Sequence, residues 1–155
     1  SVQLLPLLPP DTSSLIDLGS GAGFPGLVLA ILGVRNVELV ESDARKCAFL
    51  REVARVAGAA VTIQAKRIES VPPHPVAIVT ARACAPLDRL LVWAEPFTGP
   101  GTAYLFPKGE QAAHELAAAQ RAWTMDVTRH DSRTDPRGVI LWLKRVRRRE
   151  EPGHR

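Results

Sequence analysis

The residues of this chain with the clearest chemical meaning form one ten-residue turn, Asp-Leu-Gly-Ser-Gly-Ala-Gly-Phe-Pro-Gly from Asp17 to Gly26. Glycines in such a turn let the backbone adopt positive φ and let a ligand approach where a Cβ would block it. Apolar residues precede and follow the turn, which predicts a strand, a loop and then a helix. The helix N-terminus would add free N–H groups and the positive end of its dipole. We therefore predict a nucleotide-type binding loop.

The residues of this loop are compatible with more than one ligand. Gly21 to Gly26 matches the G-x-G-x-x-G fingerprint of dinucleotide-binding proteins. Asp17 followed by glycines at positions 19, 21 and 23 also resembles the first motif of S-adenosylmethionine-dependent methyltransferases. In those enzymes the acidic residue approaches the methionine part of the cofactor. A strand-to-helix turn without a ligand is the third interpretation.

Three charged residues follow apolar segments further along the chain. Glu41 comes after residues 36–40, about 20 residues past the loop, where a carboxylate accepts hydrogen bonds from ribose hydroxyls. Arg82 and Lys108 each follow another apolar segment. Since the carboxyl ends of parallel strands border the ligand crevice, we expect all three side chains there.

The elements that must position these residues alternate along the chain. Strands are predicted at residues 15–18, 36–40, 60–64, 76–79 and 101–106, and helices at 27–32, from Ser42 or Asp43 to Gly58, and at 87–94 and 110–123. Residues 1–10 look like the last turns of a helix. Two strands at 125–129 and 139–143 predict a closing hairpin. The pattern predicts an α/β fold, a mostly parallel sheet with helices on both faces and an antiparallel last strand.

Composition is that of an ordinary globular domain, with 46% hydrophobic and 23% charged residues among 155. No apolar run is long enough to span a bilayer and no signal peptide is apparent, so we expect a cytoplasmic protein. The net charge of +4 comes from residues 144–155. This segment predicts a basic disordered tail or an arm that binds phosphates.

Cysteines and histidines predict neither a metal site nor a disulfide. Cys47 and Cys84 lack metal-ligand spacing, which fits a reducing compartment. We interpret Cys84 as a small buried hydrophobe rather than a catalytic thiolate. The histidines show no metal-ligand grouping and are interpreted as surface residues: His74, His114, His130 and His154.

Five segments occur together in one order. They are the turn from Asp17 to Gly26, Glu41-Ser42-Asp43-Ala44-Arg45-Lys46-Cys47-Ala48-Phe49-Leu50, Arg67-Ile68-Glu69, Thr80-Ala81-Arg82-Ala83 and Phe106-Pro107-Lys108-Gly109. This combination resembles one family, ribosomal RNA small subunit methyltransferase G, also called glucose-inhibited division protein B. The resemblance implies a Rossmann-like class I S-adenosylmethionine-dependent methyltransferase domain over residues 1–146, with the family's N-terminal helical segment largely missing and a tail at 147–155. It also implies methyl transfer to N7 of guanine 527 in the 530 loop of bacterial 16S rRNA.

The resemblance assigns site residues as well. It implies S-adenosyl-L-methionine bound by Asp17, Gly19, Ser20, Gly21, Gly23, Phe24, Glu41, Ile68, Glu69 and Arg82. Glu41, in place of the family's usual Asp, would hold the ribose, and the backbone around Ile68 and Glu69 would border the adenine. The implied RNA-binding set is Lys46, Arg67, Arg82 and Lys108. The expected partner is 16S rRNA or the small ribosomal subunit, and we expect a monomer without metal.

Guanine N7 carries a lone pair and no proton, so an in-line displacement needs positioning but no general base. Arg82 and Lys108 would then hold O6 or phosphates and leave N7 free. Residues 80–83 lack the Asn/Asp-Pro-Pro-Tyr/Phe sequence of amino-methylating enzymes, and Cys84 has no preceding proline as in cytosine C5 enzymes. Both absences disfavour exocyclic nitrogen and carbon as methyl acceptors.

Other functions remain open from the residues alone. An NAD-binding oxidoreductase is supported by the fingerprint and Glu41, but the chain lacks a Tyr-x-x-x-Lys constellation. A non-catalytic RNA-binding module of the same fold would bind RNA with a steep salt dependence and ignore S-adenosylmethionine. A small-molecule methyltransferase would bind the cofactor without depending on RNA.

Overall fold

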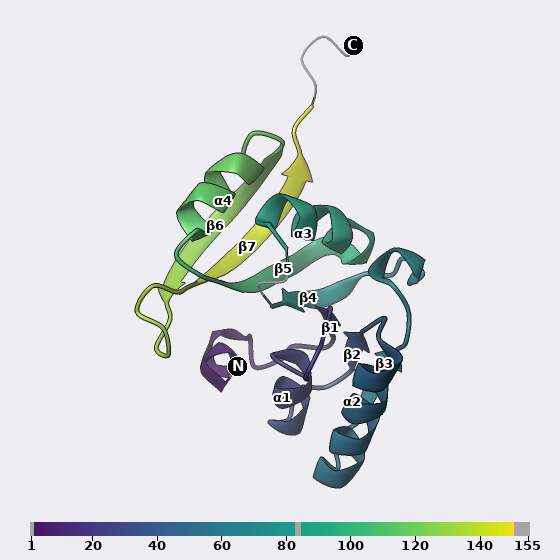
Figure 1. Ribbon diagram of the computed structural model, residues 1–155. Coiled ribbons are helices and arrows are strands. Elements are labelled where there is room, and N and C mark those ends of the chain that lie inside the picture. The colour runs from purple at the N-terminus through teal and green to yellow at the C-terminus, as the bar shows by residue number, and fades with distance from the viewer. Residues whose placement is uncertain (1, 83–84, 151–155) are drawn as a thin grey trace.

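The computed structural model describes residues 2–82 and 85–150, which form one sheet with helices on both faces (Figure 1). The strands are β1 (Leu15–Leu18), β2 (Val37–Val40), β3 (Val61–Gln64), β4 (Val76–Ala81), β5 (Thr98–Lys108), β6 (Trp123–Asp131) and β7 (Val139–Arg148). The α-helices are α1 (Gly26–Ile31), α2 (Ala44–Ala57), α3 (Leu87–Ala94) and α4 (Ala112–Ala119). Short 3-10 helices are η1 (Val2–Leu7), η2 (Ile68–Ser70) and η3 (Glu95–Phe97).

The strand order is β3-β2-β1-β4-β5-β7-β6, and β7 runs antiparallel to both of its neighbours while the first five strands are parallel. This confirms the predicted α/β fold with an antiparallel last strand. The chain moves outward from β1 to β3, then returns to place β4 on the other side of β1. In sheets of this kind the ligand crevice opens outside the carboxyl ends of the strands at that reversal. The turn after β1 and the residue after β4, Arg82, therefore lie at the same crevice.

Apolar side chains pack on both faces of the sheet. Helices α3 and α4 cover one face, and η1, α1 and α2 lie on the other (Figure 1). The first face buries Phe97, Tyr104 and Phe106, each at most 1% exposed. Complete burial of one such side chain stabilises the fold by about 1.5–3 kcal/mol. The strands that carry the crevice residues are therefore held on both sides.

Local sequence signals define α2 as predicted. The Asp43 carboxylate accepts hydrogen bonds from the backbone N–H groups of Arg45 and Lys46 at 2.9 and 3.1 Å. Such a cap contributes about 1 kcal/mol. Gly58 ends the helix in the left-handed conformation, with φ of 68°. The helix therefore begins at Ala44, directly after Asp43 and close to Glu41.

Several elements differ from the prediction in type or in bounds, and three of them bear on the helices and the closing hairpin. Residues 2–7 form a 3-10 helix because Pro6 removes a backbone donor. Helix α4 ends at Ala119, so Trp123 opens β6 instead of closing the helix. Strand β7 continues to Arg148, two residues into the expected tail, because Arg148 pairs with Trp123 across the hairpin and lies over its ring at 4.6 Å.

Other expectations concern residues outside the described part of the chain. Cys84, His154 and the last five residues belong to this group. Among the described residues, no helix combines the length and the apolar character that crossing a membrane requires.

Candidate functional site: two clefts around a glycine loop

Three glycines shape the loop between β1 and α1. Gly19, Gly21 and Gly23 have φ of 70°, 54° and 100°, a region that strains L side chains. The Ser20 N–H donates to the Val40 carbonyl at 2.9 Å, and the Gly23 N–H donates to the Ser20 carbonyl at 2.8 Å. The loop is therefore a tight turn tied to the end of β2.

Asp17 lies beneath this loop and is fully buried. Its Oδ1 accepts a hydrogen bond from the Thr80 hydroxyl at 2.8 Å, and its Oδ2 accepts from the Ser20 hydroxyl at 2.8 Å and the Gly26 N–H at 3.3 Å. Burial raises the pKa of this carboxyl from 3.8 to about 6, against the opposing effect of these hydrogen bonds and of Arg82. The carboxylate thus joins β1, β4 and the start of α1, and it positions the loop from below.

Glycine at position 26 is required by this arrangement. A Cβ there would lie 2.6 Å from the Asp17 Cβ and from its Oδ2. No other residue allows the helix to start so close to the carboxylate. The sequence identified Gly26 only as part of a motif, whereas the structure shows its close contact with Asp17.

Glu41 follows β2 and borders the first of two clefts. Its Oε1 accepts from the Gly21 N–H at 2.8 Å, and its Oε2 accepts from the Asp43 N–H at 2.9 Å. The cleft has a volume of about 180 Å³, and its lining residues come from the ends of three strands: Gly19, Val40, Glu41, Ser42, Lys66, Arg67, Ile68 and Glu69. This is less than the roughly 300–1,000 Å³ of a typical ligand pocket. An oriented carboxylate beside apolar Ile68 suits the ribose and base of a nucleoside.

The second cleft borders the same loop and is larger, about 490 Å³. Phe24 and Pro25 line it from the loop, Arg82 from the end of β4 and Lys108 from the end of β5. Arg82 is exposed, and its Nη2 lies 3.6 Å from the position of a Cβ on Gly21. The structure therefore brings Arg82, Lys108 and Phe24 together beside the loop.

Lys108 differs from Arg82 because its charge is enclosed. Only 2% of the side chain is exposed, and its Nζ donates to the Ala85 carbonyl at 2.7 Å and pairs with Glu115 Oε1 at 2.9 Å. The same Glu115 oxygen accepts from the Leu87 N–H at 2.9 Å. A direct contact of this ammonium with phosphate would require the ion pair to open. Sequence reasoning missed Glu115, for which the only signal was a carboxylate within an alanine-rich helix.

The other two residues of the expected RNA-binding set lie apart from this second cleft. Arg67 is exposed and lines the cleft of Glu41, next to Ile68 and Glu69. Lys46 is exposed on the first turn of α2 and lines neither cleft. The structure thus divides the four cations among three places.

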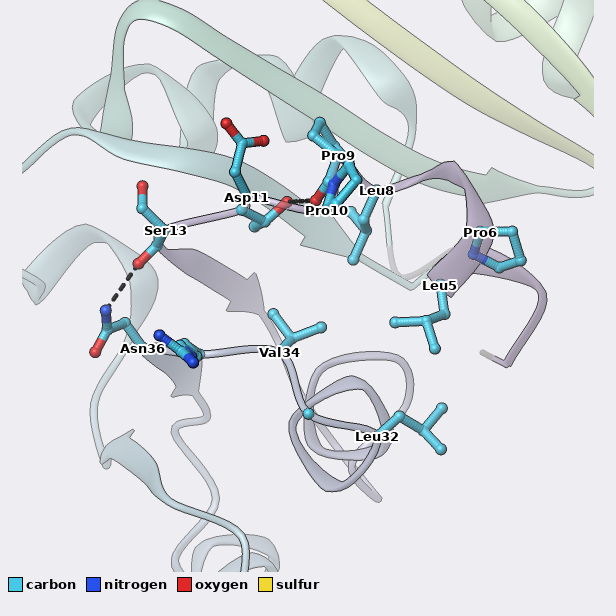
Figure 2. A pocket seen from close by; sticks show the side chains of 13 residues that line it. Leu5, Pro6, Leu8, Pro9, Pro10, Asp11, Ser13, Leu32, Val34 and Asn36 are labelled. Atoms are coloured by element: carbon cyan, nitrogen blue, oxygen red, sulfur yellow. Dashed lines mark hydrogen bonds between the residues drawn. The ribbon is translucent and has the colours of Figure 1, made fainter.

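A third hollow, about 910 Å³, lies at the amino ends of β1 and β2, away from the glycine loop. Figure 2 shows it between the segment before β1 and the turn after α1, where Leu8, Leu32 and Val34 are apolar and Asn36 Nδ2 donates to the Ser13 carbonyl at 2.8 Å. None of the expected site residues lines it. Within the described residues, no cluster of three His, Cys, Asp or Glu side chains is arranged to hold a metal ion.

Comparison with known sequences identifies close relatives. The family model described as rRNA small subunit methyltransferase G matches residues 1–139. The ribosomal RNA small subunit methyltransferase G of Paramagnetospirillum magneticum is 56% identical over 148 residues, which cover 96% of this chain and 72% of that protein. The protein of the same name from Rhodospirillum centenum is 57% identical over 146 residues, covering 94% of this chain and 68% of that protein.

Solved structures share the fold at low sequence identity. The ribosomal protein L11 methylase of Lactobacillus delbrueckii subsp. bulgaricus has a TM-score of 0.74 at 16% identity, over 93% of this chain and 75% of that chain. A glycopeptide N-methyltransferase complexed with S-adenosylhomocysteine has a TM-score of 0.73 at 11% identity, over 92% of this chain and 86% of that chain. These likenesses confirm the predicted class I methyltransferase fold.

Proposed function

Because this chain belongs to the ribosomal RNA small subunit methyltransferase G family, we propose that it transfers a methyl group from S-adenosylmethionine to N7 of guanine 527 in 16S rRNA. The observation that carries this proposal is the pair of clefts that share one glycine loop. One cleft offers an oriented carboxylate to a nucleoside, and the other offers an exposed arginine to a second ligand. A transferase needs two such sites with a common wall.

The residues of the first cleft fit S-adenosylmethionine. Glu41 is held by two backbone N–H groups, so its free lone pairs point in set directions for ribose hydroxyls. Ile68 supplies apolar surface for the adenine, and Arg67 and Glu69 flank it. Gly19, Ser20, Gly21 and Gly23 keep the loop backbone close to the bound molecule. Asp17 contributes negative charge beneath the loop, where the ammonium of the methionine part would come near.

The cofactor supplies a methyl group on a sulfonium, whose carbon–sulfur bond breaks as the bond to N7 forms and whose positive charge passes to the purine. No proton is released, so the chain needs no general base. Its residues have to hold the base in line and exclude competing geometries. Arg82 is placed to bind O6 or a neighbouring phosphate and leave N7 accessible.

The remaining cations take different parts in this proposal. Arg67 and Lys46 bind the RNA backbone near the cofactor cleft and along α2. Lys108 acts through position, because the ammonium contacts the Ala85 carbonyl and its partner Glu115 contacts Leu87 at the start of α3. We also propose that residues 1–148, which include all of β7, form the catalytic domain and that the residues after Arg148 assist RNA binding. We further propose that the protein is a monomer and that it works in the cytoplasm, where its substrate lies.

Calorimetric titration with S-adenosylmethionine and S-adenosylhomocysteine tests the cofactor part, with NADH as the control ligand. We expect saturable binding of the first two, weakened in Glu41→Ala and abolished in Gly21→Trp, and no binding of NADH. Binding of NADH alone would identify an oxidoreductase. RNA binding by a chain that binds neither S-adenosylmethionine nor S-adenosylhomocysteine would identify a non-catalytic module.

Methyl transfer to small ribosomal subunits lacking the modification tests the substrate part. We expect incorporation that falls sharply when the target guanine is changed to adenine. Arg82→Ala should lower transfer while leaving cofactor affinity intact. Equal transfer by Arg82→Ala and the unchanged protein would contradict the role of this residue.

A further inference from the structure

Phe24 is a large apolar side chain left 47% exposed on the glycine loop. It stands between Gly23, whose backbone is bonded to Ser20, and Pro25, which precedes α1. Its neighbours in space belong to the second cleft, beside Arg82, and it does not line the cleft of Glu41. The ring is therefore an aromatic surface on a constrained loop at the edge of the larger cleft.

The turn between β6 and β7 forms another wall of this cleft through Ser132, Thr134 and Asp135. Figure 1 shows it at the lower left, beside η1. Gln3 of η1 holds the turn, because its Oε1 accepts from the Arg133 N–H at 2.8 Å. The Gly138 N–H also donates to the Asp135 carbonyl at 2.9 Å. This wall is thus formed before a ligand arrives, which lowers the entropy lost on binding.

Asp135 presents a carboxylate in this wall. One oxygen accepts from the Arg137 N–H at 3.0 Å. A carboxylate has about four acceptor sites on two oxygens, so others remain for a ligand. Guanine carries adjacent donors at N1 and N2 on its Watson–Crick edge, and adenine has an acceptor at N1. A carboxylate at this edge therefore favours guanine over adenine.

The chemistry of the purine sets its orientation in the cleft. Transfer to N7 requires that this atom face the glycine loop, where the cofactor site begins. The N1 and N2 edge lies on the other side of the purine and then faces away from the loop, toward the β6–β7 turn. We infer that the second cleft takes the target guanine out of the RNA stack, with Phe24 against the face of the base and Asp135 accepting from N1–H and N2–H. This inference rests on the proposed function.

Removal of either contact, Phe24 with the base or Asp135 with its N1 and N2 edge, should lower kcat/KM measurably. Base–aromatic stacking and a paired base-edge contact each change binding on the order of 10- to 100-fold. We therefore expect Phe24→Ala to lower kcat/KM for small ribosomal subunits by that factor, and Phe24→Tyr to retain most of it. Asp135→Asn should lower kcat/KM for subunits with guanine at the target position. It should also lower the ratio of this kcat/KM to that for subunits with adenine there.

Matched controls separate these effects from general damage. Val92 on α3 is 46% exposed and lines neither cleft, so Val92→Ala should leave transfer unchanged. Asp131 is exposed at the end of β6 and lies outside the second cleft, so Asp131→Asn should also be silent. Thermal melting of every variant checks that it is folded.

Affinity for S-adenosylhomocysteine decides between the possible results. Reduced transfer by Phe24→Ala with unchanged affinity supports the inference. A parallel loss of affinity would make Phe24 a cofactor residue and overturn it, as would full transfer by both Phe24→Ala and Asp135→Asn. If the unchanged protein binds S-adenosylhomocysteine but methylates no subunit, the proposed substrate fails and the inference fails with it.

Discussion

The Lys108 ammonium lies 2.9 Å from the Glu115 carboxylate and joins the end of β5 to α4. Since the lysine side chain is almost fully enclosed, removal of its partner leaves a largely buried charge without its counter-charge. The same carboxylate oxygen accepts from Leu87 at the start of α3. One ion pair therefore ties the end of β5 to α4 and to the start of α3.

Glu115→Ala should lower the free energy of unfolding by about 3 kcal/mol, because breaking a buried pair costs more than the pair itself contributes. The double variant Lys108→Met with Glu115→Leu should recover most of that loss. Chemical denaturation measures both. Arg55→Ala, which removes the exposed pair with Glu52, is the control and should change stability little. Equal stability of Glu115→Ala and the unchanged protein would contradict the structural role.

Asp17 gives a prediction about pH. Its pKa rises from 3.8 to about 6 on folding, so between these values the folded state binds more protons than the unfolded state. The contribution of Asp17 to stability is then present below about pH 4 and is lost as the pH rises through about 6, by at most about 3 kcal/mol. Asp17→Asn should remove this dependence while keeping oxygen and amide partners for Ser20, Gly26 and Thr80.

The measurement is the difference in unfolding free energy between the unchanged protein and Asp17→Asn across pH 4 to 7, which cancels the titration of other groups. The difference should favour the unchanged protein most at the acid end. A difference that stays constant with pH would show that the carboxyl titrates normally.

Gly26→Ala should destabilise the protein through overpacking, because the new Cβ would lie 2.6 Å from Asp17. Strain of this kind costs about 1–3 kcal/mol, which lowers the melting temperature by roughly 2–4 °C per kcal/mol in a domain of this size. Gly109→Ala is the matched control, since a Cβ there meets nothing within 4 Å. Equal melting temperatures for the two variants would show that α1 can shift away from Asp17.

His74, which the sequence suggested to be a surface histidine, makes two contacts that affect its protonation. Its Nε2 lies 2.6 Å from Glu38 Oε1 and its Nδ1 lies 2.9 Å from the Pro72 carbonyl oxygen. Both ring nitrogens therefore face acceptors, and both contacts favour the protonated ring. The Pro72 carbonyl foremost, together with Glu38, raises the pKa of His74 above 6.5. Its contribution to stability should be complete below pH 6.5 and should disappear as the pH rises through the folded pKa. His74→Gln should flatten that part of the unfolding profile.

Much of this molecule was predictable from short stretches of sequence. The glycine loop, the start of α2 after Asp43 and its end at Gly58 depend on local backbone preferences, which a single residue type reveals. The alternation of apolar segments likewise predicted the order of strands and helices. It also placed Glu41 and Arg82 at the crevice, because parallel strands bring their carboxyl ends to one edge.

The tertiary structure decided where each charge is placed and what it contacts. Asp17 contacts Thr80, 63 residues away, and Lys108 contacts Ala85, 23 residues away, across separations that no local pattern records. Both side chains are charged residues at strand ends, a class that is usually exposed to solvent and ligand. Whether such a side chain is buried, and which residues it contacts, depends on how the connections between parallel strands place each helix against the sheet. The sequence by itself determined the loop and the elements around it, and packing determined which charges face a ligand and which hold the loop in place.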